Sequence, residues 1–156
     1  MSESKESGIL KKIWLFNDLE PEHIESIAKL LKPVKAKENT AIIKENTKGR
    51  EIYILIDGQV RVSKFINGKE EAITFLNPGA IFGEMAILGN FERTAEIIAH
   101  TDVVMFQIDG KKFVSLLDSN PQMGFKVYRK MAITLAKRLK ELDERYHSIL
   151  SLATMF

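Results

Sequence analysis

The residues best suited to chemistry lie close together, in the stretch IFGEMAILGNFERTAEIIA. Gly83 has no Cβ, so it allows backbone N–H groups to approach a ligand closely. The apolar run that follows fits one helical turn, and the N–H groups at the start of a helix attract anions. Arg93 adds a guanidinium that can grip a phosphate through two hydrogen bonds, and Thr94 adds a hydroxyl donor. These residue types in this order predict a phosphate site.

Glu84 adds a carboxylate to the same stretch, and a carboxylate accepts hydrogen bonds from sugar hydroxyls. A phosphate grip beside such an acceptor suits a compact sugar phosphate. Two simpler interpretations stay open at this point. In the first, Gly83 is only a turn glycine. In the second, Glu84 and Arg93 form a surface ion pair of little energetic consequence.

The order and spacing of these residues resemble the phosphate-binding cassette of the cyclic nucleotide-binding domain family, F-G-E-x-A-[LI]-[LI], a short loop and R-[AST]-A. The matching residues are Phe82, Gly83, Glu84, Ala86, Ile87, Leu88, Arg93, Thr94 and Ala95. The resemblance implies that Glu84 binds the ribose 2′-hydroxyl and that Arg93 binds the cyclic phosphate. It also implies that backbone amides near Gly83 and Ala86 complete the cradle. The expected ligand contacts are Phe82, Gly83, Glu84, Met85, Ala86, Arg93, Thr94 and Ala95. Some members of this family keep the fold and bind no nucleotide.

The resemblance leaves two ligands open. Bacterial members mostly bind cAMP, which is therefore the expected ligand. Thr94 stands where many cAMP binders carry alanine or serine and where cGMP-preferring kinase domains carry threonine, so cGMP is the alternative. The base is expected to meet the C-terminal helix around Arg138, Leu142 and Asp143, from the same subunit or a partner subunit.

The composition is that of an ordinary globular protein and excludes several classes. The 156 residues are 45% apolar and 28% charged, and the net charge of +2 gives no reason to expect nucleic acid or an anionic membrane as a partner. The absence of cysteine excludes disulfides, thiolate nucleophiles and cysteine-ligated metals. Neither a signal peptide nor a membrane span is evident, so a cytoplasmic location is expected.

The chain is expected to fold as three segments: a flexible start at residues 1–7, a jelly-roll domain with N-terminal helices at 8–120, and a long helix at 121–156. A short helix is expected over Ile9–Phe16 and a second one from Pro21, with His23 on its solvated face. The apolar stripe of the second helix is Ile24, Ile27, Ala28 and Leu31, and Trp14 and Phe16 are expected to pack beneath it.

Short β-type runs fill the middle of the chain: AIIKE, EIYILI, QVRVSKFI, EEAITFL, AEIIA and VVMFQI. Asn67-Gly68 and Asp57-Gly58 predict tight turns between them. In the third run Phe65 is expected inside, with the alternation slipping near Ser63. This pattern predicts a mainly β fold with flanking helices, a double-stranded β-helix or jelly roll. Metal-binding jelly rolls need converging histidines, and the three histidines here are not paired at ligand spacing, so no metal is expected.

Asp109 is expected to cap a short helix, and Asn120-Pro121 to open a long one. Apolar residues then recur at spacings of four and three: Tyr128, Ala132, Leu135, Leu139, Leu142, Tyr146, Ile149, Ala153 and Phe156. This heptad seam predicts a homodimer through a coiled coil. The alternative is a helix that packs only on its own roll and caps the pocket.

The expected function is that of a sensor that binds a cyclic nucleotide, repositions its C-terminal helix and signals to an unidentified effector protein. Transcription factors of the catabolite-activator type continue into a helix-turn-helix domain, whereas this sequence ends at Phe156. The sequence therefore predicts a free-standing sensor without direct DNA binding, or else the ligand-sensing fragment of such a regulator. A phosphodiesterase-like enzyme is disfavoured, because no metal cluster or evident general base accompanies the cassette.

Overall fold

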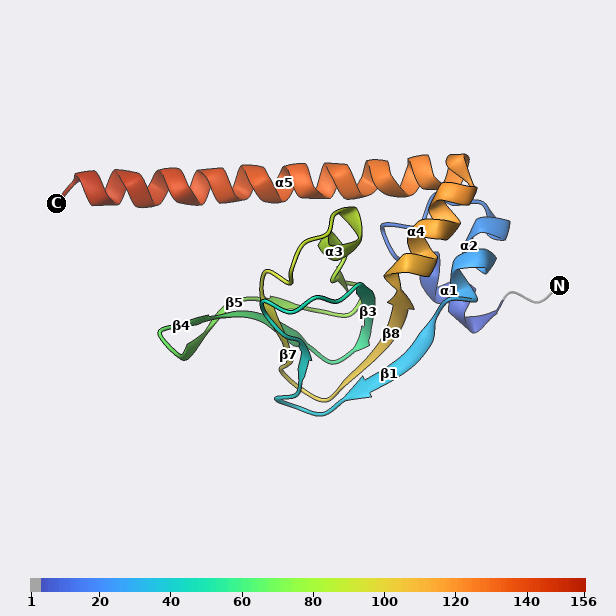
Figure 1. Ribbon diagram of the computed structural model, residues 1–156, viewed down its shortest axis with the longest axis horizontal. Coiled ribbons are helices and arrows are strands. Elements are labelled where there is room, and N and C mark those ends of the chain that lie inside the picture. Colours follow the sequence, from blue (N-terminus) through green and yellow to red (C-terminus); the bar gives the residue numbers. More distant parts are fainter. Residues whose placement is uncertain (1–3) are drawn as a thin grey trace.

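The computed structural model describes residues 4–156, and its centre is a roll of two antiparallel four-stranded sheets (Figure 1). The first sheet has the order β1 (Lys32–Ala36), β8 (Val103–Asp109), β3 (Glu51–Asp57) and β6 (Ile81–Phe82). The second has the order β2 (Ala41–Ile43), β7 (Glu96–Ala99), β4 (Val60–Ile66) and β5 (Lys69–Leu76). The expected jelly roll with flanking helices is confirmed.

Strand β3 of the first sheet is buried on both faces. Ile52 and Ile54 belong to an apolar cluster shared with the helices, while Tyr53 and Leu55 belong to a second cluster between the sheets. Successive side chains of a strand point to opposite faces, so a strand covered on both sides is apolar at every position. The uninterrupted run EIYILI is the sequence signature of this position.

The helices surround one end and one side of the roll. Helices α1 (Lys5–Leu10), α2 (Pro21–Ala28) and α4 (Gly110–Ser119) gather at one end, and α5 (Pro121–Thr154) runs along the side (Figure 1). Asp109 caps α4 by accepting from the Lys111 and Lys112 amides, and Asn120 caps α5 by accepting from the Met123 amide. Both predicted helix starts are confirmed.

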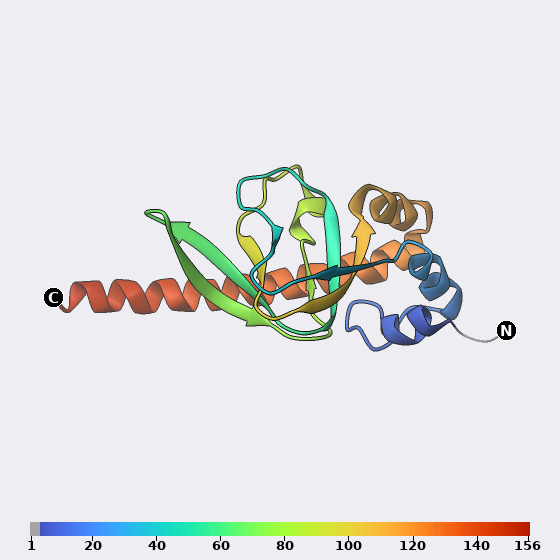
Figure 2. The same ribbon diagram turned by 90° about the horizontal axis from the view of Figure 1, so that it is seen from below.

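Only the first third of α5 is buried. Met123, Val127 and Met131 pack into the apolar cluster that the first sheet shares with the helices. Every residue from Ala136 onward is exposed. Figure 2 shows this distal part extending past the β4–β5 hairpin. No helix within residues 4–156 is long and apolar enough to cross a membrane.

The N-terminal segment differs from the expectation. Ser4 caps α1 by accepting a hydrogen bond from the Ser7 amide, so residues 5–7 are helical rather than flexible. Residues 1–3 lie outside the described part of the chain. The expected helix over Ile9–Phe16 gives way to turns after Leu10, and these turns bury Phe16 but leave Trp14 40% exposed.

Two further side-chain expectations are wrong. His23 is 4% exposed rather than solvated, and its Nε2 lies 3.0 Å from the side-chain Nδ2 of Asn120 at the start of α5. Phe65 is 48% exposed rather than inside. Side chains of a strand alternate between its two faces, and Val62 packs on the core between the sheets. Phe65 therefore lies on the opposite face, together with Arg61 and Ser63, which bind the Glu70 carboxylate.

Candidate functional site

The expected cassette forms a pocket between the second sheet and α5. It joins β6 to β7 and contains the single-turn helix α3 (Met85–Leu88), which lies between the roll and α5 (Figure 1). The pocket has a volume of about 230 Å³. Its lining consists of Ile81, Phe82, Gly83, Glu84, Met85, Ala86, Phe91, Glu92, Arg93, Thr94 and Ala95 from the cassette region, Ile43, Val62, Thr74, Leu76 and Ile97 from the strands, and Arg138 from α5.

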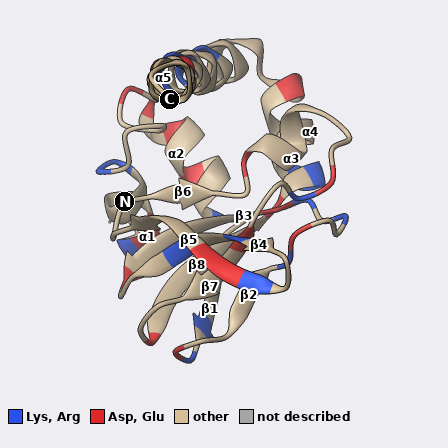
Figure 3. Cartoon of the chain, turned by 90° about the vertical axis from the view of Figure 1, so that its left-hand side faces the viewer, with Lys and Arg blue, Asp and Glu red and all other residues tan. Residues whose placement is uncertain are grey.

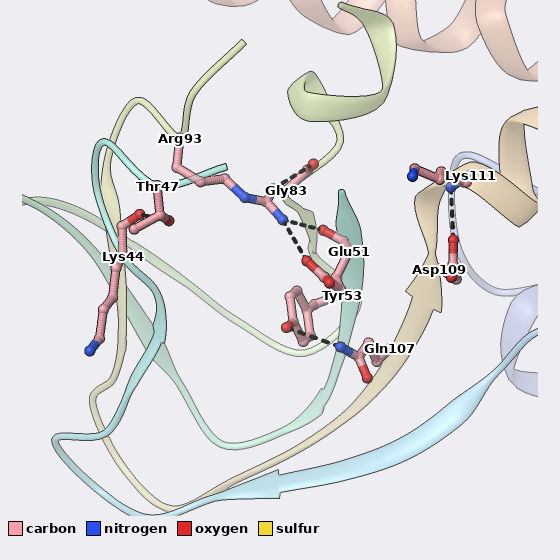
Figure 4. A network of polar contacts seen from close by, with 9 residues as sticks. All are labelled: Lys44, Thr47, Glu51, Tyr53, Gly83, Arg93, Gln107, Asp109 and Lys111. Atoms are coloured by element: carbon pink, nitrogen blue, oxygen red, sulfur yellow. Dashed lines mark hydrogen bonds and ion pairs between the residues drawn. The ribbon is translucent and has the colours of Figure 1, made fainter. Parts of the chain in front are cut away.

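Arg93 is the buried cation of this site. It is 7% exposed, and its guanidinium lies between β3 and the turn before α3 (Figure 4). Its Nη1 donates to the Gly83 carbonyl at 3.0 Å, and its Nη2 donates to the Glu51 carbonyl at 2.8 Å. The Glu51 carboxylate lies 3.4 Å from Nη2 and balances the charge. A buried cation held by two carbonyls and one half-exposed carboxylate keeps further N–H donors for an anion, since a guanidinium carries five.

Gly83 has a structural role beyond an open approach for a ligand. Its φ of +84° lies in the left-handed region, which residues with a Cβ rarely adopt. A Cβ at this position would lie 2.7 Å from the Glu51 carbonyl and 3.0 Å from Nη1 of Arg93. The glycine therefore allows the cassette to touch β3 and its carbonyl to reach the arginine.

Glu84 does not pair with Arg93, so the simple ion pair considered from the sequence is absent. Its Oε1 instead lies 2.6 Å from Nη1 of Arg138 on α5. The Glu84 side chain is 14% exposed and that of Arg138 50%. The carboxylate that faces the pocket thus has a charged partner from the helix that passes over the pocket.

The sequence located most of the pocket and missed part of its frame. All eight expected cassette residues line it, and so does Arg138. Leu142 and Asp143 do not; both are exposed on the distal part of α5. Glu51 is the main omission, because it lies 42 residues from Arg93 in the chain and belongs to a strand that otherwise reads as core. No signal in the sequence links the two.

Tyr53 supports the floor of the site. Its ring stacks on Phe82 at a centroid distance of 5.2 Å, which fixes the start of the cassette. Burial raises the pKa of the Tyr53 hydroxyl, and the nearby Glu51 carboxylate raises it further. The side-chain Nε2 of Gln107 donates a hydrogen bond to that hydroxyl at 3.3 Å. Tyr53 is therefore neutral at physiological pH and acts through packing.

Charged residues of both signs are spread over the molecule, so the charge that matters at the site is that of its own side chains. Figure 3 shows basic and acidic positions on the roll and on the helices alike. In the part of the chain that the structure describes, no group of three or more His, Asp or Glu side chains could hold a metal ion. The chemistry offered by the pocket is thus that of one buried guanidinium, carboxylates and apolar walls.

Known proteins share both the sequence pattern and the fold. The model of the cyclic nucleotide-binding domain family matches residues 33–120, more than half of the chain. The CRP-like cAMP-activated global transcriptional regulator of Mycobacterium tuberculosis is 27% identical over 136 residues, which are 86% of this chain and 59% of that protein. A cGMP-dependent protein kinase of Caenorhabditis briggsae is 34% identical over 113 residues, 70% of this chain and 15% of the kinase. The chain thus spans less than two thirds of these relatives.

Solved structures of related proteins have the same fold. A cyclic nucleotide-binding domain from Methylobacillus flagellatus matches with a TM-score of 0.76 and 26% identity, over 90% of this chain and 79% of that one. The regulatory domain of Toxoplasma gondii PKA, crystallised with cAMP, matches with a TM-score of 0.66 and 27% identity, over 71% of this chain and 42% of that one. On the family match, the fold and these relatives, the chain belongs to the cyclic nucleotide-binding domain family.

Proposed function

We propose that this chain is a regulatory sensor that binds cAMP in the pocket at the cassette. The observation that carries the proposal is the position of Arg93, a buried guanidinium at the wall of a pocket that also holds Glu84. Arg93 binds the cyclic phosphate, Glu84 binds the ribose 2′-hydroxyl, and the backbone near Gly83 and Ala86 completes the cradle. The apolar side chains on the strand side of the pocket receive the base.

The choice of cAMP is supported by two relatives whose names include it, the M. tuberculosis regulator and the T. gondii regulatory domain. The C. briggsae kinase and Thr94 favour the alternative, cGMP. We propose binding rather than catalysis because the pocket lining contains no histidine and the described residues offer no metal cluster. Ligand binding then shifts α5, and an effector protein reads the shift.

Calorimetric titration with cAMP and with cGMP tests the ligand. We expect saturable binding of one nucleotide per chain, with cAMP the tighter ligand. Thr94→Ala should weaken cGMP by about three- to tenfold, the loss of one hydrogen bond, and leave cAMP nearly unchanged. Tighter binding of cGMP by the unmodified chain would establish the alternative. Failure of both ligands to bind would leave a member of the family that keeps the fold alone.

We also propose that the distal part of α5 pairs with a second copy of the chain. Leu139, Leu142, Tyr146 and Ile149 are each more than half exposed and lie on the heptad seam. An apolar stripe of this length is unusual on a monomer surface. The proximal part of the seam is not equally available, because Tyr128 packs against the apolar cluster that the first sheet shares with the helices.

Light scattering tests the pairing. We expect the mass of two chains for the unmodified protein and the mass of one chain for Leu142→Asp combined with Ile149→Asp, because each carboxylate would be buried in the seam. Ile133→Asp is the matched control, since Ile133 is exposed on the same helix but lies off the seam. A single-chain mass for the unmodified protein at high concentration would contradict the proposal.

A further inference from the structure

A second cavity, the α5 cavity, lies beneath the middle of α5 and beside the pocket at the cassette. Its volume is about 130 Å³. That is about ten times the space that one water molecule needs, and voids of this size are rare in close-packed interiors. Six residues line the α5 cavity and not the pocket: Trp14, Leu15, Ala80, Met131, Thr134 and Leu135. Most of its wall is therefore separate from the proposed nucleotide site.

The walls of the α5 cavity are held in place by buried side chains and by contacts across it. Leu15 and Met131 are 2% and 3% exposed. Nζ of Lys130 donates to the Trp14 carbonyl at 2.8 Å and lies 2.9 Å from the Asp18 carboxylate. These contacts fix the segment that carries Trp14 to the first part of α5. Closing the cavity by moving either element would disturb them.

The lining suits a small uncharged ring. Trp14 contributes an indole, on which another aromatic ring packs favourably in an offset or edge-to-face arrangement. The volume is close to the roughly 150 Å³ of an engineered apolar cavity that binds benzene. The charged residues of the lining, Glu84 and Arg138, are paired with each other at 2.6 Å. A charged ligand would therefore find no free counter-charge and would lose its hydration without compensation.

Thr134 adds an unused hydroxyl group to this wall. Hydroxyls further along α5 donate to the backbone carbonyl four residues earlier, as Ser148 does to Glu144 and Ser151 does to His147. Within residues 4–156 the Thr134 hydroxyl has no hydrogen-bond partner of any kind. A hydroxyl both donates and accepts, so it can pair with a hydroxyl of a ligand.

We propose that the α5 cavity binds a small uncharged aromatic molecule with one hydroxyl group, a phenol. The ring packs on Trp14, and the hydroxyl forms a hydrogen bond with Thr134. Trp14 is 40% exposed, so the cavity reaches the surface beside the indole and a small molecule can enter there. The inference does not depend on the proposed nucleotide function, because neither Trp14 nor Thr134 lines the pocket at the cassette.

Calorimetric titration of the unmodified chain with phenol tests the site. We expect one phenol per chain, with a dissociation constant below about 1 mM, which is within reach of so small a ligand. Trp14 is the only tryptophan of the chain, so its fluorescence should change over the same range of phenol concentration. Thr134→Val keeps the size of the side chain and removes the hydroxyl. It should weaken phenol by about three- to tenfold and benzene by less than about twofold.

A matched pair of variants locates the bound phenol. Ala80 lines the α5 cavity and not the pocket, whereas Ala95 lines the pocket and not the α5 cavity. Ala80→Leu fills the cavity and should weaken phenol at least about tenfold, while Ala95→Leu should change its affinity by less than about twofold. Circular dichroism checks the fold of both variants.

Three results would overturn the inference. The first is the absence of saturable phenol binding up to about 10 mM. The second is a loss of binding in Ala95→Leu with full binding in Ala80→Leu, which would place the phenol in the pocket at the cassette. The third is equal weakening of phenol and benzene by Thr134→Val, which would show that the hydroxyl of Thr134 does not bind the ligand. Thr134→Val also tests the site if Ala80→Leu fails to fold, because Thr134 lies on the surface of α5.

Discussion

Replacing Arg93 with alanine is expected to weaken cAMP binding at least about thirtyfold, which corresponds to about 2 kcal/mol. Arg93 is 7% exposed, and its guanidinium is already oriented by the carbonyls of Gly83 and Glu51. A phosphate at this position therefore meets a charged donor that has lost most of its side-chain freedom before the ligand arrives. Calorimetry on the variant, with its fold checked by circular dichroism, measures the loss.

Two matched variants separate charge from geometry. Arg93→Lys keeps the positive charge but loses the planar fork, so its affinity should lie between those of the unmodified chain and Arg93→Ala. A separate cavity next to the pocket is lined by Lys48 and also by Arg93. Lys48→Ala removes a cation from that cavity and should change the affinity by less than about twofold. A loss below about 1 kcal/mol for Arg93→Ala would place the phosphate elsewhere.

Replacing Phe113 with alanine is expected to lower the free energy of unfolding by about 3–5 kcal/mol, the usual cost of deleting a buried phenyl ring. Phe113 lies on α4, is 1% exposed and packs edge-to-face on Phe16 at a centroid distance of 6.1 Å. The cavity that alanine leaves would lie in the cluster that joins the first sheet to the helices. Urea unfolding, followed by circular dichroism, measures the change in midpoint at constant slope.

Phe125 provides the control for this variant. It is 67% exposed on α5, so Phe125→Ala should change the free energy of unfolding by less than about 0.5 kcal/mol. A loss below about 1.5 kcal/mol for Phe113→Ala would mean that the site collapses around the smaller side chain.

The cluster around Phe113 also explains how the pocket and α5 can communicate. Ile87 of α3, Phe113 of α4 and Val127 of α5 belong to one apolar core. The cassette helix and the fixed part of α5 therefore rest on the same packed side chains, and packed cores respond to displacement as a unit. The pocket thus has two connections to α5, this core near the start of the helix and Arg138 further along.

The sequence by itself determined the features that depend on neighbouring residues. Asn67 and Gly68 have φ values of 53° and 76°, as the predicted hairpin turn requires, and Asp109 and Asn120 cap the helices they were expected to cap. The spacing of the cassette was sufficient to place all eight of its expected residues on one pocket. Signals of this kind are local, because a turn, a cap or a short loop is decided by residues a few positions apart.

Tertiary structure alone decided the partners that lie far apart in the chain. β1 contains Pro33 and was missed as a strand, because proline is tolerated in a strand only at a sheet edge, a position that the topology assigns. The buried stripe of α5 runs through Val127 and Met131, which lie off the heptad seam that the sequence pattern predicts. The pairing of Arg93 with Glu51 and of Glu84 with Arg138 likewise follows from where the strands and α5 are packed. Such contacts depend on the whole fold, whereas a sequence pattern reports only its own neighbourhood.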